Sequence, residues 1–565
     1  SGAVIDPANN QVEKSSANKL RQEYQAYLEY KYSLNEKHSF KAMGGLSYEN
    51  YRTDAFSATG DKLSTGSIHS LNTASAITAE DAISEYALAS YFARLNYDYK
   101  GKYLVELLGR YDGSSRFARG HRWSPFFGVS AAWRISEEKW MKSNSIFDNL
   151  KLRLSYGETG NQAGIGVYDY YATISQIQNG GPLLGNSYTD YIKYGSVVSY
   201  NRTWEKVCNS NIGLDFSILN NRLSGTFDLF QRVNNDMLVA VTYPQVYGAT
   251  APDTNSGKLK VKGWEIALQW RDRIGSVSYW IGGNLSDSKN KLVRMEGKQT
   301  KTWNGITSAL EGYALNTVWG LEAIKLIETE DELATYKATV GNVYAGAQTE
   351  LKVGDVMYKD LDNDGKITTA DVKLLGDTAP HYNYSFNFGL SWKGIDFSCL
   401  FQGVGKQLVF RSLNSSTALG YSWYQNSSKA FFDNHWTTVA EQCAAAGDLR
   451  STLPVNRNPN AAPRIAYLAG KNYNYLASDA WWRSQNGAYL RMKNISLGYT
   501  FPMQLTKRLN IEKLRLYVAG NDLLTFCKIK DGYDPENISY KNSTATSYTN
   551  YPFASSFIFG IDLTF

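Results

Sequence analysis

Residues 382–392 read Tyr-Asn-Tyr-Ser-Phe-Asn-Phe-Gly-Leu-Ser-Trp, with a large apolar side chain at every second position and a small or polar one between. Successive side chains of a β-strand point to opposite faces, so this period of two predicts a strand with one apolar face and one polar face. Residues 150–156 and 223–229 repeat the pattern. The chain is therefore expected to be all-β.

Alternating segments of this kind recur about fifteen times along the chain. They lie near residues 18–33, 38–53, 86–100, 101–112, 122–136, 148–157, 202–219, 222–237, 258–271, 275–292, 380–393, 394–411, 485–502, 510–527 and 553–565. Most are longer than the ~5–6 residues of an ordinary strand and reach the ~9–11 residues that a tilted membrane strand needs. Segments of this length predict a transmembrane antiparallel β-barrel.

The connections between these segments alternate between short and long. Short turns such as Asn220-Asn221 and Lys393-Gly394 contrast with long loops over 293–379 and 412–484. Outer-membrane barrels have short periplasmic turns and long extracellular loops. The final segment ends on Phe565 and is expected to end in the periplasm, which places every short turn inside and both long loops outside.

A soluble β-sandwich or β-propeller also alternates between an inner and an outer face. The alternative is therefore a secreted soluble glycan-binding β protein with a calcium-stabilised loop. Aromatic side chains at the ends of the apolar stripe, such as Tyr382 and Trp392, favour the membrane barrel, because aromatic rings gather at membrane interfaces. In segment 485–502, Leu490 and Met492 are out of phase with the apolar residues that follow, which predicts a β-bulge.

Composition excludes several classes of function. The 59 Lys and Arg exceed the 53 Asp and Glu by only 6 and are spread along the chain, so a nucleic-acid partner is not expected. The four cysteines lie far apart, without the spacing of a zinc site. The five histidines are dispersed, and no HExxH, GxSxG or phosphate-binding loop is present, so the chain is not expected to be an enzyme.

One local motif carries specific chemistry. Residues 360–371 read Asp-Leu-Asp-Asn-Asp-Gly-Lys-Ile-Thr-Thr-Ala-Asp, which matches a twelve-residue calcium loop with acids at positions 1, 3, 5 and 12 and Gly at position 6. The expected Ca²⁺ ligands are Asp360, Asp362, Asp364, the Lys366 carbonyl, a hydroxyl or water at Thr368, and Asp371. The alternative is an acidic turn without a metal. A bound ion is expected to fix the conformation of an otherwise floppy loop.

Large aromatic side chains in the two long loops are candidates for substrate or partner contact. They are Trp319, Trp423, Tyr424, Trp436, Trp481 and Trp482. Such rings could stack on sugars or hold a peptide, but they could equally pack against a partner protein or within their own loops.

Several ordered motifs are similar to the barrel of SusC/RagA-type TonB-dependent transporters. They are Trp204-Glu205-Lys206, Asn211–Phe216, Asn220–Gly225, Val261–Ile266, Gly354–Ile367 and Leu490–Tyr499. The resemblance spans nearly the whole chain. It implies a 22-stranded barrel in the bacterial outer membrane, of which the chain would supply strands 8 to 22, with the first strands, plug domain and TonB box lying upstream of residue 1.

The resemblance also implies a function. It implies TonB-dependent import of oligosaccharides or oligopeptides, with a SusD-like surface lipoprotein covering the mouth of the barrel and TonB acting from the periplasm. Lipid of the outer membrane would surround the barrel.

Overall fold

The computed structural model describes most of the chain. The described residues are 10–65, 67–142, 146–177, 180–185, 187–195, 197–241, 244, 246, 251–296, 305–307, 309–341, 350–410, 434–437, 456–458, 460–464, 476–529, 534–536 and 553–565. Among them, no helix is both long enough and apolar enough to cross a lipid bilayer.

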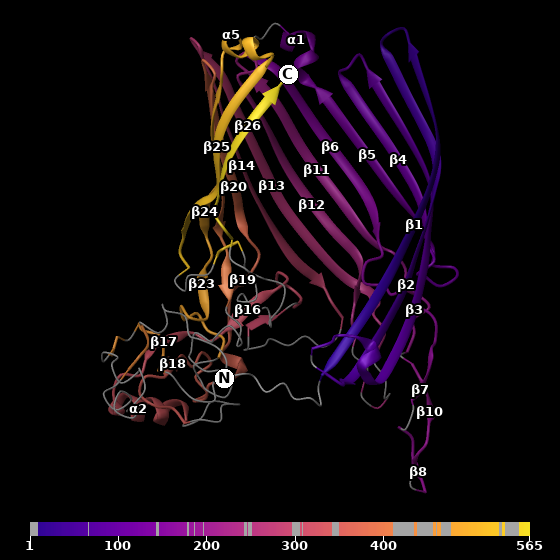
Figure 1. Ribbon diagram of the computed structural model, residues 1–565, viewed down its shortest axis with the longest axis vertical. Helices are drawn as coiled ribbons and strands as arrows, with labels where there is room; N and C mark the ends of the chain where they lie inside the picture. The colour runs from indigo at the N-terminus through magenta and orange to yellow at the C-terminus, as the bar shows by residue number, and fades with distance from the viewer. Residues whose placement is uncertain are drawn as a thin grey trace. The chain divides into compact units, whose positions relative to one another are not determined.

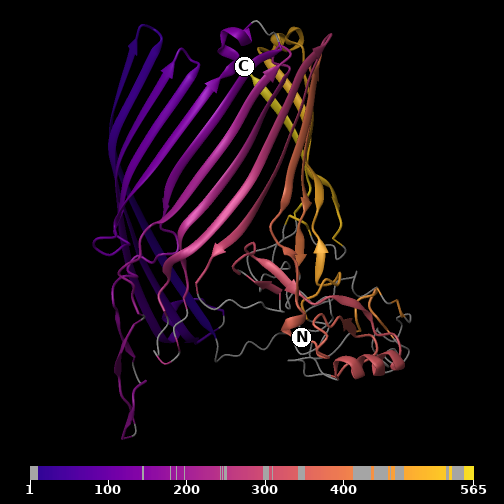
Figure 2. The ribbon, with the colours of Figure 1, turned by 180° about the vertical axis from the view of Figure 1, so that it is seen from behind.

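The fifteen predicted segments form one antiparallel sheet, which confirms the fold class. Its strands are β1 (Gln11–Leu34), β2 (His38–Leu63), β3 (Ala74–Tyr99), β4 (Tyr103–Ser114), β5 (Trp123–Arg134), β6 (Phe147–Asn161), β11 (Glu205–Ile218), β12 (Leu223–Val239), β13 (Thr254–Ile274), β14 (Val277–Arg294), β20 (His381–Trp392), β21 (Ile395–Lys406), β24 (Tyr489–Thr500), β25 (Lys513–Cys527) and β26 (Ser556–Thr564). Each strand pairs with the next of these in chain order, and both ribbon views show long neighbouring strands (Figures 1 and 2).

The sheet exposes the apolar stripe that the sequence predicts. On β20, Phe386, Phe388 and Leu390 are 37–39% exposed. A regular row of exposed large apolar side chains is unfavourable in water but matches a hydrocarbon environment. Twelve residues at ~3.3 Å each span ~40 Å, which at a tilt of about 45° rises ~28 Å and covers the ~25 Å apolar band of an outer-membrane barrel.

Left-handed backbone conformations form the tight turns. Asn35 and Glu36 have φ values of 53° and 54° between β1 and β2, and Lys393 and Gly394 have 44° and 89° between β20 and β21. Positive φ at both central residues is typical of the hairpin turns that match strand twist. These two connections are short, as predicted, but the alternation is not strict, because the connection 135–146 between β5 and β6 is longer than the connection 115–122 between β4 and β5.

The predicted bulge lies at Lys493. Leu400 of β21 pairs with Asn494 and Phe401 pairs with Met492, so Lys493 has no partner residue in the ladder. The same interruption between Met492 and Asn494 appears against β25. The extra residue restores the alternation of faces, as expected from the change of phase in the sequence.

The strands β2 and β3 are longer than predicted. The segment 38–53 continues to Leu63, and the segment 86–100 begins at Ala74. The added residues 54–63 include Asp54, Ser57, Thr59 and Asp61 and do not alternate clearly. Small and polar side chains fill most of this stretch, so the period of two gave no signal there.

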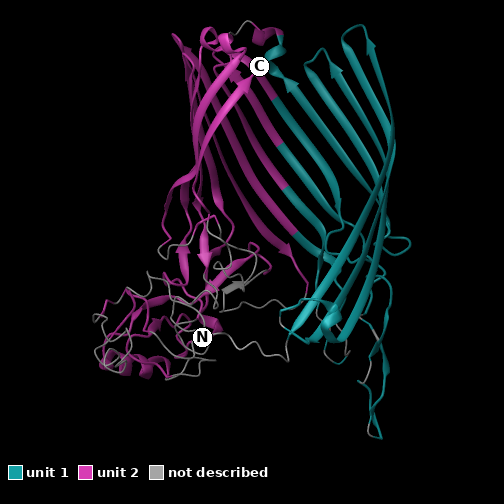
Figure 3. Ribbon diagram, in the orientation of Figure 1, with its two compact units in different colours: residues 1–138, 152–211, 232–258 teal, residues 139–151, 212–231, 259–565 magenta. Residues whose placement is uncertain are grey.

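The chain forms two compact units (Figure 3). Unit 1 comprises Ser1–Glu138, Leu152–Asn211 and Arg232–Lys258, and unit 2 comprises Lys139–Lys151, Ile212–Gln231 and Leu259–Phe565. Unit 1 also contains two small hairpins, which pair β7 (Ile174–Ile177) with β10 (Tyr191–Tyr194) and β8 (Leu183–Leu184) with β9 (Ser187–Tyr188).

The Trp204-Glu205 motif organises a small core in unit 1. The Trp204 ring packs on Phe117 and Phe126, and its Nε1 donates to the Arg122 carbonyl at 2.8 Å. Glu205 is 5% exposed and accepts hydrogen bonds from the Leu238 N–H at 2.7 Å and from the side-chain amides of Asn161 and Asn234 at 2.7 and 3.1 Å. These contacts satisfy the buried carboxylate, which gives the motif a structural role.

The alternation of short and long connections predicts which residues face the cell exterior. In a background with the four native cysteines replaced by serine, Asp331→Cys should react with a membrane-impermeant maleimide on whole cells. Asn220→Cys should react only after lysis, because its turn faces the periplasm. The control is equal labelling of both variants in lysed cells, and the opposite pattern on whole cells would overturn the orientation.

Candidate metal centre and loop domain

Two long connections of unit 2 fold into a domain of their own. The first, between β14 and β20, contains β15 (Gly305–Thr307), β16 (Thr317–Gly320), β17 (Ala323–Leu326), α2 (Glu330–Val340), β18 (Val356–Tyr358) and β19 (Lys373–Asp377). The second, between β21 and β24, contributes β22 (Leu408–Phe410) and β23 (Ser484–Asn486). We call the described residues 309–380 and 407–488 the loop domain.

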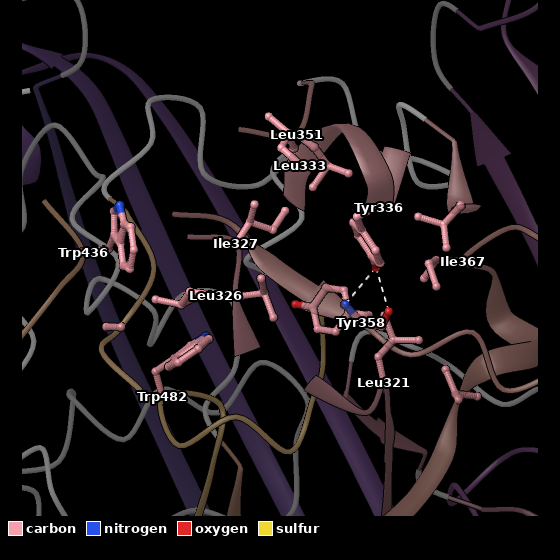
Figure 4. Close-up of a cluster of buried hydrophobic side chains, with 14 of the residues drawn as sticks. Leu321, Leu326, Ile327, Leu333, Tyr336, Leu351, Tyr358, Ile367, Trp436 and Trp482 are labelled. Carbon is pink, nitrogen blue, oxygen red and sulfur yellow. Dashed lines mark hydrogen bonds between the residues drawn. The ribbon is translucent and has the colours of Figure 1, made fainter. Parts of the chain in front are cut away.

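A hydrophobic core holds the loop domain together (Figure 4). Leu321, Leu326 and Ile327 of the first connection are fully buried, and Trp436 and Trp482 of the second pack into the same cluster. Fully burying one large apolar side chain contributes ~1.5–3 kcal/mol. Apolar side chains from both connections therefore supply a core, and the effect of an ion on the acidic turn stays a prediction.

A buried hydrogen-bond pair lies inside this core. The Tyr336 hydroxyl, carried by α2, donates to the Tyr358 carbonyl at 2.7 Å and accepts from the Tyr358 N–H at 2.8 Å (Figure 4). Thr329 caps α2 by accepting from the Glu332 N–H at 3.2 Å. The helix is thereby fixed to β18 through backbone groups that water cannot reach.

Three of the six candidate aromatic contacts are core residues. Trp319, Trp436 and Trp482 are 4%, 1% and 6% exposed, so the interpretation of these three as contacts for substrate or partner was wrong, and packing within their own loops holds instead. Trp481 packs at the edge of the same core and donates to the Asn460 carbonyl at 3.2 Å. Trp423 and Tyr424 lie outside the described residues.

The acidic turn brings three of the predicted ligands together. Ligand atoms of Asp360, Asp362 and Asp364 all lie within 4.8 Å of one another. The Asp360 carboxylate accepts from the Asn363 N–H at 2.7 Å and from the Gly365 N–H at 2.9 Å. Asn363 and Gly365 have φ values of 59° and 77°, which give the sharp turn that the motif requires.

Asp371, the fourth predicted carboxylate ligand, lies apart from these three. It is fully buried and accepts from the Leu361 N–H and the Thr368 N–H, both at 2.7 Å. It closes a capping box with Thr368 on the 3-10 helix η5 (Thr369–Asp371). Asp371 is therefore not a member of the three-carboxylate group, and its carboxylate fixes both ends of the turn instead.

Two of the three clustered carboxylates, Asp362 and Asp360, have opposing pKa shifts. Burial raises the pKa of Asp362, and the nearby Asp364 charge adds to the effect. For Asp360, burial acts in the same direction, but hydrogen bonds from the Gly365 and Asn363 N–H groups outweigh it and lower the pKa. Crowded anions of this kind, with hard oxygen atoms, fit the ligand preference of Ca²⁺. Ile367 at position 8 is 1% exposed and anchors the turn in the domain core.

A cavity of about 780 Å³ with mixed polar and apolar walls lies in unit 2 where the loop domain meets β20 and β21. Residues from both long connections line it, among them Lys373, Asp377, Gln485 and Asn486, together with Lys406 of β21. Lys373 joins the two connections through ion pairs with Glu322 at 3.0 Å and Asp479 at 2.9 Å. The cavity therefore offers charged and amide groups in a volume typical of small-ligand sites.

His381 stands in the wall of this cavity. It is 9% exposed, with Nδ1 2.7 Å from Asp287 Oδ1 and Nε2 3.1 Å from Asp377 Oδ1. Nothing in the sequence marks His381 as a candidate site residue. Its two carboxylate partners lie 94 and 4 residues away in the chain, and only the fold brings all three side chains together.

Comparison with known proteins defines the class. Residues 14–523 match the family described as TonB dependent receptor-like, beta-barrel, and the chain belongs to this family. The chain is therefore an outer-membrane β-barrel protein of the TonB-dependent receptor class. Members of this class are not enzymes. The alternative of a secreted soluble protein was wrong.

Individual relatives and a solved structure show which proteins the chain resembles. The chain is 27% identical over 553 residues to the TonB-dependent receptor P26 of Formosa agariphila, covering 95% of this chain and 52% of that protein. It is 26% identical over 491 residues to the TonB-dependent receptor SusC of Bacteroides thetaiotaomicron, covering 85% and 44%. The structure of the RagAB peptide transporter matches with a TM-score of 0.75 at 22% identity, covering 98% of this chain and 56% of that chain. The chain thus spans about half the length of the relatives it matches, and it is similar to SusC in sequence and to the RagAB peptide transporter in fold.

The two hydrogen bonds between the Tyr336 hydroxyl and the Tyr358 backbone allow a test of the loop-domain core. Tyr336→Phe should destabilise the domain by about 2 kcal/mol or more, because it removes the hydroxyl that pairs two buried backbone groups. Hydrogen exchange of α2 and β18 should accelerate by at least about tenfold. Tyr313→Phe is the matched control, because Tyr313 is 38% exposed. Unchanged exchange in Tyr336→Phe would show that the pair does not stabilise the domain.

Proposed function

We propose that the protein containing this chain imports oligosaccharides or oligopeptides across the outer membrane, driven by TonB and assisted by a SusD-like surface lipoprotein. The similarity to SusC and to the fold of a peptide transporter over nearly the whole chain carries this proposal. The cavity beside the loop domain is compatible with a substrate that has both polar and apolar groups, because Gln485 and Asn486 lie in its wall beside Leu374 and Leu408.

Exposed apolar side chains support a protein partner. On the small hairpins of unit 1, Ile174, Leu184 and Ile192 are 65%, 68% and 71% exposed. An isolated two-stranded hairpin is at best marginally stable in water, and apolar residues on it gain stability when another surface covers them. The long loops 293–379 and 412–484 carry the aromatic residues predicted as candidate contacts, and these hairpins add a second region.

Uptake by whole cells tests the proposed function. Cells should take up labelled oligosaccharides or oligopeptides of matched size only when the full-length protein, TonB and the lipoprotein are all present. Deletion of the tonB gene should abolish uptake while surface abundance of the barrel stays constant. Preference for one of the two substrates identifies the class. Equal uptake in cells with and without the barrel protein would refute the proposal.

We also propose that the acidic turn binds Ca²⁺ and stabilises one edge of the loop domain. Asp360, Asp362 and Asp364 would supply carboxylate oxygens, and the Lys366 carbonyl and water near Thr368 would complete the coordination. Extracellular calcium sites commonly have Kd values of ~0.1–1 mM, for which 10 mM Ca²⁺ would stabilise the bound form by about 1.4–2.7 kcal/mol. Magnesium is disfavoured, because its small octahedral shell suits such a turn poorly.

Limited proteolysis of the full-length protein tests the calcium site. Removing calcium from the wild type should raise the cleavage rate within 355–376 by about tenfold or more, while the membrane strands stay intact. Asp362→Ala should be cleaved rapidly with or without calcium. Asp331→Ala is the matched control, because Asp331 is an exposed acid of α2 outside the turn. Equal cleavage of the wild type in both conditions would exclude the site.

A further inference from the structure

The last three strands of the sheet have two chemically distinct faces. On one face, Arg515 of β25 pairs with Asp396 of β21 at 2.6 Å and with Asp562 of β26 at 3.0 Å. On the other face, Leu516 and Val518 of β25 are 40% and 44% exposed. Because alternate residues of one strand make these two faces, the ion-paired face is directed away from lipid and the apolar face toward it.

The apolar face is not flat. A groove of about 670 Å³ runs over β24, β25 and β26, lined by the apolar side chains Leu497, Tyr499, Leu516, Val518, Phe559 and Ile561. Phe559 and Ile561 stand 82% and 66% exposed at one wall. Gly498 and Gly560 lie between these groove residues on their strands, and a side chain at either would point to the opposite face, toward Arg515 and Tyr517. Its shape and lining fit a hydrocarbon chain.

A cationic connection begins at the end of this groove. The Phe501 N–H donates to the Leu514 carbonyl at 2.9 Å, only two residues from Tyr499 and from Leu516 in the groove wall. The connection then forms α5 (Met503–Thr506) and the 3-10 helix η10 (Lys507–Leu509). Figure 1 shows α5 beside the end of β25.

This connection has the composition of a membrane-interface segment. Met503, Leu505 and Leu509 are 58%, 64% and 71% exposed, and Lys507 and Arg508 lie between them. Residues 501–511 contain no acid, and Glu512 is the first to follow. Apolar side chains next to cations at the level of lipid headgroups attract anionic lipid.

We propose that the groove and this connection bind one anionic glycerophospholipid. An acyl chain lies in the groove of Leu497, Leu516 and Phe559, and the headgroup phosphate pairs with Lys507 and Arg508. The two cations determine the preference for a negatively charged headgroup, and the groove retains one chain against exchange with bulk lipid. The proposal depends on the outer-membrane location and not on the transported substrate; the orientation predicted above assigns the lipid to the periplasmic leaflet.

Native mass spectrometry of the full-length protein, purified from outer membranes and delipidated, tests the proposal. The probes are phosphatidylglycerol and phosphatidylethanolamine with identical acyl chains. The wild type should retain phosphatidylglycerol about tenfold better, in keeping with two cations near the headgroup. Lys507→Glu combined with Arg508→Glu should abolish that preference. Val518→Trp, which fills the groove, should lower retention of both lipids.

The matched control is Lys37→Glu combined with Lys100→Glu. These lysines are neighbours in two short turns of unit 1, where the Lys100 N–H donates to the Lys37 carbonyl at 2.7 Å, and the change in charge is the same. The control should keep the wild-type preference, and all variants should keep wild-type uptake. Equal retention of both lipids by the wild type, or an unchanged preference in the Lys507/Arg508 variant, would overturn the proposal.

Discussion

The constraint on which this structure depends is that every backbone N–H and C=O crossing hydrocarbon must be hydrogen-bonded within the protein. No water is available there, and each unsatisfied group costs several kcal/mol. Fifteen antiparallel strands, each paired with the next in the chain, meet this requirement for the interior of the sheet. Among the described residues, β1 and β26 each pair on one side only, and the further strands of a 22-stranded barrel remain our prediction for their other edges.

The same constraint separates the chain into two kinds of structure. Strands such as β20 obtain stability from the ladder and expose their apolar side chains, Phe386 and Leu390 among them, to lipid. The loop domain lies in water, so it buries its apolar side chains as a soluble protein does. Leu326, Val356 and Trp436 are among them. One chain thus contains an apolar surface and an apolar core, each explained by its solvent.

Three arrangements of charged side chains lie at the sites to which we assign a function. Asp371 is buried and fixes the ends of the acidic turn through two N–H groups, which leaves Asp360, Asp362 and Asp364 gathered for a cation. His381 lies between two carboxylates in the wall of the cavity beside the loop domain. Arg515 pairs across three strands on the opposite face to the apolar groove. Each arrangement depends on groups from several elements.

The sequence by itself determined the strands, their number and order and the bulge at Lys493, because a period of two follows from strand geometry alone and requires no knowledge of neighbours. It also determined the local acidic turn, since the ligands of such a turn are close in the chain. The burial of Trp319, Trp436 and Trp482, the carboxylate partners of His381 and the groove over β24–β26 were decided only by the tertiary structure. These depend on contacts between residues tens to hundreds of positions apart, and the amino-acid types alone are equally compatible with an exposed ring, a solitary histidine or a flat sheet face.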